Sequence, residues 1–99
     1  MKIILEKNRS VLTEYGGYRL KYQLVEYGPQ DEDGRPFYGI SICQKRSDTM
    51  ELFDICLIRE VTDEMDKARR FFIKLVEGLV MPVSLPDLVE DWHYAGEAV

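Results

Sequence analysis

The C-terminal third of the chain carries the clearest alternation of apolar and polar positions. From Thr62 to Leu79, apolar residues recur at steps of three and four, which predicts an amphipathic helix. Its apolar stripe consists of Met65, Ala68, Phe72, Leu75, Val76 and Leu79. Thr62 is the expected N-cap, because its hydroxyl can accept a hydrogen bond from a first-turn N–H group. Gly78 and then Pro82 are the expected stop, since glycine tolerates a left-handed conformation and proline cannot continue the helix.

A second, shorter helix is predicted directly afterwards. Ser84 is its expected N-cap, and Pro86 falls in a first turn that needs no amide donor. The apolar positions again follow helical spacing: Leu85, Leu88, Val89 and Trp92. Two C-terminal helices are therefore expected.

The N-terminal part of the chain has the alternation of strands. Tyr18, Leu20, Tyr22 and Leu24 occupy every second position and predict a half-buried strand. The segment 3–15 reads less clearly, as two short strands with a turn at 7–10, and 28–36 reads as a solvated connection rich in glycine, proline and acids. Strands at about 37–45 and 51–60, joined by the polar loop 46–49, predict a hairpin.

That loop length predicts how the last two strands pair. The register brings three apolar pairs together: Ile42 with Phe53, Ile40 with Ile55, and Tyr38 with Leu57. We expect the helices to cover this face, with Phe72 and Leu75 in contact with it. The expected fold is a single α+β domain over residues 1–99, an antiparallel sheet of three to four strands followed by two C-terminal helices packed on one face.

The opposite face of the sheet holds a second set of apolar residues, which one small core would leave uncovered. These candidate interface residues are Val25, Tyr27, Phe37, Leu52, Cys56 and Ile58. A soluble protein seldom exposes a large contiguous apolar patch. Either residues 1–15 cover this face, or a protein partner does; the sequence leaves both open.

Composition narrows the classes of partner. Eighteen acidic and thirteen basic residues give a net charge of −5, which argues against a protein that binds nucleic acid by neutralising phosphates. No stretch approaches the about 18 apolar residues of a membrane span, and the N-terminal apolar run is too short for a signal peptide. We expect a cytoplasmic bacterial protein without membrane association.

Candidates for chemistry are few. Cys43 and Cys56 are about four residues out of the expected register, farther apart than a disulfide allows, so free thiols are expected. Glu90 and His93 have a metal-ligand spacing, but such a site needs a second copy of the motif and further glutamates from long facing helices. This helix is short, and a solvated acidic helix end is the simpler interpretation. The same single histidine leaves either cysteine without a clear base.

A basic strip is the other candidate. Arg19, Lys21 and Arg59 could gather on the open sheet face, flanked by Tyr27 and Phe37, in a layout used for single-stranded nucleic acid. The negative net charge and the lack of an aromatic platform motif count against it.

Three segments carry a resemblance to a known family. Tyr18–Leu20, Tyr38–Ile40 and Met81–Trp92 together resemble a family of roughly hundred-residue clostridial proteins classed as a domain of unknown function. The resemblance covers most of the chain from residue 18 onward, and Met81 and Trp92 depart conservatively from its usual residues. It implies the same order of elements and brings no activity or cofactor.

The sequence therefore predicts a non-enzymatic cytoplasmic protein-interaction or regulatory module. It predicts no catalytic, cofactor-binding or metal-binding residues. The expected partner is a second copy in a homodimer or an unidentified protein. The alternative is a weak nucleic-acid or small-ligand binder that uses the exposed sheet face. A basic and aromatic face would favour this alternative, and an apolar face would favour the interaction module.

Overall fold

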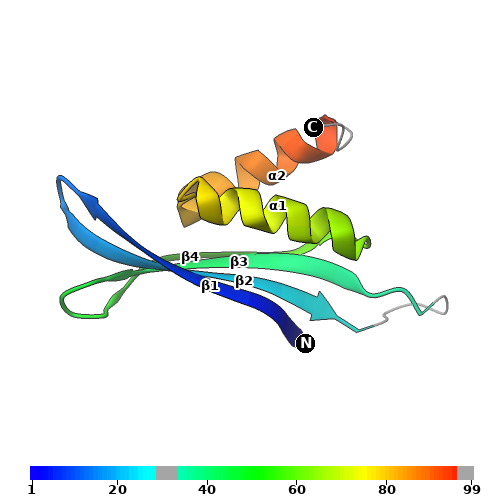
Figure 1. Ribbon diagram of the computed structural model, residues 1–99, viewed down its shortest axis with the longest axis horizontal. Helices are drawn as coiled ribbons and strands as arrows, with labels where there is room; N and C mark the ends of the chain where they lie inside the picture. The colour runs from blue at the N-terminus through cyan, green and yellow to red at the C-terminus, as the bar shows by residue number, and fades with distance from the viewer. Residues whose placement is uncertain (29–33, 96–99) are drawn as a thin grey trace.

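A computed structural model describes residues 1–28 and 34–95 as a four-stranded antiparallel sheet with two helices on one face (Figure 1). The strands follow one another in the order β1-β2-β3-β4, so each hairpin joins neighbours. The elements are β1 (Lys2–Thr13), β2 (Gly16–Tyr27), β3 (Phe37–Arg46), β4 (Leu52–Thr62), α1 (Met65–Glu77), the short 3-10 helix η1 (Pro82–Ser84) and α2 (Leu85–Tyr94). The predicted α+β class and order are confirmed. Most of the expected connection at 28–36 lies outside the described residues.

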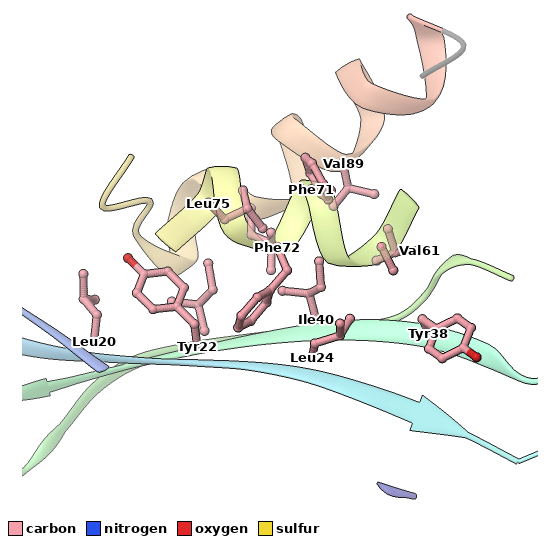
Figure 2. Close-up of a cluster of buried hydrophobic side chains, with 13 residues drawn as sticks. Leu20, Tyr22, Leu24, Tyr38, Ile40, Val61, Phe71, Phe72, Leu75 and Val89 are labelled. Atoms are coloured by element: carbon pink, nitrogen blue, oxygen red, sulfur yellow. The ribbon is translucent and has the colours of Figure 1, made fainter. Parts of the chain in front are cut away.

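The core lies between the helices and the sheet face beneath them (Figure 2). Leu20, Tyr22 and Leu24 on β2 point toward the helices, as their alternation predicts, and all three are fully buried. Phe72 of α1 packs in the same cluster and has no exposed surface. Burial of a side chain of this size stabilises the folded state by roughly 1.5–3 kcal/mol. The Tyr22 hydroxyl donates to the Val80 carbonyl oxygen at 2.9 Å, which connects the sheet to the end of the helix.

The expected turn at 7–10 is wrong, because β1 is one continuous strand. It pairs with β2 from Lys2, opposite Glu26, to Thr13, opposite Gly16. The polar residues at 7–10 can belong to this strand because β1 lies at the edge of the sheet. Its backbone groups still form hydrogen bonds with β2. Arg9 points to the helix side, where its Nη1 donates to the Val76 carbonyl oxygen at 3.0 Å. Residues 1–15 thus extend the sheet and do not fold across its open face.

The predicted register of β3 and β4 is also wrong. Ile40 lies opposite Ile58, Ile42 opposite Cys56, and Cys43 opposite Ile55. Lys45 pairs with Leu52 while Gln44 pairs with Asp54, so Phe53 is an extra residue on β4. One extra residue sends every side chain beyond it to the other face. Cys56 and Ile58 therefore face the helices, whereas Ile55 and Leu57 face away.

The helix boundaries agree with the predictions only in part. Thr62 is the last residue of β4 and not the N-cap; its Oγ1 accepts the Glu64 N–H at 3.1 Å, and α1 begins at Met65. Gly78 ends α1 as predicted, but the left-handed residue is Leu79, with φ 53°. Ser84 precedes α2 as predicted, although its side chain makes no capping hydrogen bond.

Phe71, expected to lie off the helical stripe, is buried as well. Its ring stacks on Trp92 of α2, with centroids 4.8 Å apart and planes at 17°. α1 therefore buries two adjacent positions, Phe72 against the sheet and Phe71 against α2. A prediction based on one apolar stripe misses the second contact.

Candidate functional site

The first candidate site is the side of the sheet opposite α1 and α2, called here the helix-free face. Of the six predicted interface residues, Val25 and Tyr27 lie on this face but are buried, and Phe37 is half-buried. Leu52 is exposed there. Cys56 and Ile58 were placed on this face wrongly; the register turns them toward the helices, where they pack against the core.

Ile3 and Leu12 of β1 are exposed apolar residues of the helix-free face. A further set of exposed apolar side chains forms a line on β4, called here the β4 row. It consists of Leu52, Ile55 and Leu57, which are 58%, 54% and 47% exposed. Their cross-strand partners on β3 are Lys45, Cys43 and Ser41. β4 is the last strand of the sheet, so the row lies along an edge. Two of its three residues were predicted to be core.

Three cations lie beside this row. Arg19 is opposite Lys45 across β2 and β3, and Lys21 is opposite Cys43. The three basic side chains line a shallow hollow of about 400 Å³ together with Glu6, Asn8, Cys43 and Met50. None of the three forms an ion pair within residues 1–28 and 34–95.

The candidate basic strip of Arg19, Lys21 and Arg59 with flanking aromatic residues does not form. Arg59 lies 5.0 Å over the Tyr27 ring, and Tyr27 pairs with Phe37. This cluster is eight residues along β2 from Arg19, about 26 Å at the rise of an extended strand. The aromatic rings are therefore at one end of the face and the paired cations Arg19 and Lys45 at the other.

A second candidate lies on the helix side of the sheet, beyond the end of the helix layer. It is a groove of about 850 Å³, called here the terminal groove. Its lining comes from the β1–β2 turn, the sheet and the connection between the helices: Thr13, Glu14, Tyr15, Tyr18, Gln44, Phe53, Asp54, Met81 and Val83. In Figure 1 the β1–β2 hairpin curls toward the α1–α2 connection on the side where this groove lies.

Apolar groups dominate the terminal groove. The rings of Tyr18 and Phe53 lie 5.0 Å apart at 58°, and the bulge at Phe53 brings that ring to the helix side. Tyr15, Phe53 and Val83 are largely exposed. The sequence pattern predicts Phe53 in the core and does not predict the groove. One signal was present: Gln44 continues the core-facing alternation of Ile40 and Ile42 with a polar side chain.

The cysteines and the histidine do not form a reactive cluster. Both thiols are free, as expected, although the reason is different: Cys43 and Cys56 are near in register but face opposite sides of the sheet. Burial, with a contribution from Asp54, raises the pKa of the Cys56 thiol, which disfavours the reactive thiolate. His93 Nε2 lies 2.6 Å from the Val61 carbonyl oxygen and holds α2 to the end of β4.

Other features of the described chain bear on metals and membranes. Across residues 1–28 and 34–95, no three His, Cys, Asp or Glu side chains are placed to hold a metal ion together. No helix in the same residues is both long and apolar enough to cross a membrane.

Comparison with known proteins identifies a family for this chain. Neither the curated proteins nor the solved structures include a match to this chain. A family model described as a family of unknown function, DUF6514, matches residues 1–95. The matched region spans all four strands and both helices. The chain therefore belongs to this family of unknown function.

Proposed function

We propose that this protein is a non-enzymatic, cytoplasmic protein-interaction or regulatory module that binds a protein partner through its helix-free face. The partner is a second copy of the chain or an unidentified protein. A clostridial source, which the sequence resemblance implies, is part of the same proposal.

The observation that carries this proposal is the β4 row. Leu52, Ile55 and Leu57 each leave about half of their surface in water, on a strand that has a free edge. Exposed apolar edge strands pair readily with other chains, and proteins usually shield them with charges, prolines or bulges. The stretch from Ile55 to Ile58 contains no charge or proline, and its outward positions are aliphatic. A partner that covers the row would remove this apolar surface from water.

A charge in the β4 row tests the proposal. Leu57→Glu should abolish association, because the carboxylate would be buried unpaired in the contact, and should change thermal stability little, because Leu57 is already half exposed. Ser10→Glu is the matched control, since it places the same charge on the helix-free face at the opposite edge strand. Light scattering over a concentration series measures the molecular mass in solution, and thermal melts test whether each variant is folded.

The result separates the two kinds of partner. A dimer that becomes a monomer in Leu57→Glu but not in Ser10→Glu identifies a second copy. A monomeric wild type calls for pull-downs, in which the partner should be retained by wild type and Ser10→Glu and lost by Leu57→Glu. A monomer whose retained proteins are identical for all three baits contradicts the proposal.

The alternative function, a weak nucleic-acid or small-ligand binder, is supported by Arg19, Lys21 and Lys45. Their hollow offers three cations that no described acidic group neutralises by an ion pair. The apolar β4 row and the separation of these cations from Tyr27 and Phe37 favour the interaction module. Titration with a single-stranded oligonucleotide and with inorganic phosphate would decide: saturable binding lost in Lys45→Glu would favour the alternative.

A further inference from the structure

We propose that the terminal groove binds a peptide segment in which an apolar side chain stands next to lysine or arginine. This inference goes beyond the proposed function, because the groove and the helix-free face lie on opposite sides of the sheet. Its occupant need not be the partner that covers the β4 row.

The shape of the groove is the first argument. Three segments that are distant in the sequence meet there: the β1–β2 turn, the bulge of β4, and the connection from α1 to α2. They hold Tyr15, Phe53 and Val83 around an open hollow instead of packing them together. A volume of about 850 Å³ falls within the range of ligand sites, which is on the order of 300–1,000 Å³.

Gln44 supplies a second and independent argument. The residue is only 6% exposed, lines the groove, and makes no side-chain hydrogen bond within the described parts of the chain. Its amide atoms are not among the fully enclosed polar atoms without a partner in the described residues, so they still reach solvent and can form a hydrogen bond through the groove that the residue lines. The carboxamide offers one acceptor and two donors, which match the C=O and N–H groups of a peptide backbone. A peptide in the groove would take the place of water at this amide.

Charge determines which peptide fits. Among the described residues, the charged groups that line the groove are Glu14 and Asp54, both acidic, and no described lysine or arginine lines it. Neither carboxylate forms an ion pair within residues 1–28 and 34–95, although Asp54 Oδ1 accepts the Ile55 N–H at 2.9 Å. Phosphorylated or acidic ligands would be repelled at this rim. A peptide can match both the apolar lining and the acidic rim. Its apolar side chain would lie between Tyr18, Phe53 and Val83, and a neighbouring lysine or arginine would lie beside Glu14 or Asp54.

The test is a titration monitored by NMR. The probe is N-acetyl-lysyl-phenylalanyl-lysine amide, added to ¹⁵N-labelled full-length protein. Saturable shifts are expected at the Gln44 side-chain amide and at the backbone amides of Glu14, Phe53 and Val83, with affinity in the millimolar to high micromolar range. Two control peptides isolate the contributions: replacement of phenylalanine by alanine, or of both lysines by glutamate, should each weaken binding roughly tenfold or more.

Variants locate the site. Val83→Arg should abolish saturation, because the exposed side chain brings a bulky cation into the groove. Gln44→Leu should weaken binding by roughly tenfold through loss of the amide contact. Leu57→Arg, the matched control, places the same cation on the helix-free face and should leave the titration unchanged. Thermal melts verify that each variant folds.

Three results would overturn the inference. These are shifts outside the groove, equal binding of the glutamate peptide, or unchanged binding by a folded Val83→Arg. None of them bears on the mass measurements of Leu57→Glu, so failure of the groove and failure of the proposed function can be told apart.

Discussion

At the scale of single residues, Tyr22 shows how a polar group can belong to the core. Its side chain is fully buried, and its hydroxyl reaches the Val80 carbonyl oxygen beyond the end of α1. Burial raises the pKa of Tyr22 to about 12, since the phenolate would be poorly solvated there; Arg9 opposes this effect in part. The folded state therefore holds this proton more tightly than the unfolded chain, whose tyrosine pKa is near 10.

This difference predicts a loss of stability in alkali. Below pH 10, Tyr22 makes its full contribution to the free energy of unfolding. This contribution disappears as the pH rises from 10 toward about 12, because in this range the unfolded chain releases the proton and the folded chain keeps it. Tyr22→Phe should cost about 1–3 kcal/mol at neutral pH and should show a weaker decline over this window. Urea melts across the pH range check both, with the exposed Tyr15→Phe as control. Parallel declines in wild type and Tyr22→Phe would contradict the assignment.

At the scale of elements, α1 is held by two different contacts. Phe72 packs into the sheet, whereas Phe71 stacks on the half-buried Trp92 of α2. The two aromatic residues are neighbours in sequence but support different layers of the fold. The sheet contact is completely enclosed, and the stack has one side near solvent.

Alanine substitutions should separate these contacts. Phe72→Ala should cost about 3–5 kcal/mol of unfolding free energy, and Phe71→Ala clearly less, because its site can collapse more easily. The Phe71 and Trp92 substitutions should couple by about 0.5–1.5 kcal/mol in a double-mutant cycle. Ile73→Ala, at a position of α1 where the side chain is 44% exposed, is the control. Denaturant melts measure these values; equal losses for Phe71→Ala and Phe72→Ala would contradict the difference in enclosure.

At the scale of the whole molecule, a long sheet extends beyond a shorter helix layer. The principal extents are 47 × 27 × 16 Å, and Figure 1 shows the β1–β2 hairpin reaching past the helices. This mismatch leaves the terminal groove open on the helix side of the sheet. The β4 row is exposed for another reason, because it lies on the side that neither α1 nor α2 covers. The molecule could therefore hold two partners at once.

Independence of these surfaces is testable with the variants already named. Leu57→Glu should abolish association and leave peptide binding unchanged. Val83→Arg should abolish peptide binding and leave association unchanged. The double variant should lose both properties, with effects that add, because the sites share no contact residues. Light scattering and the NMR titration on the same four proteins measure this. Loss of peptide binding in Leu57→Glu would show that the surfaces are coupled.

Local pattern determined a large part of this structure. The alternation at Tyr18, Leu20 and Tyr22 placed β2 with the correct face inward, and the spacing around Phe72 and Leu85 placed both helices. These predictions succeed because a strand or helix with one apolar face follows a period of two or 3.6 residues. The α+β order followed from the sequence of these elements.

Tertiary structure decided which face of β4 points outward. One extra residue, Phe53, reverses the side chains after it, moving Ile55 and Leu57 to the helix-free face and Ile58 to the core. Both faces of β4 carry apolar residues, so its sequence pattern could not select between them. The second irregularity of this hairpin depends on Gly39, where a side-chain carbon would lie 2.6 Å from the Ile58 carbonyl oxygen.

The candidate sites depended on the same long-range packing. Burial of Phe71 required α2 to pack beside it, and the terminal groove required three separate segments to meet around Gln44. Local periodicity determines which way a side chain points within its own element. Only the packed chain determines what lies opposite that side chain, because those neighbours come from segments far away in the sequence.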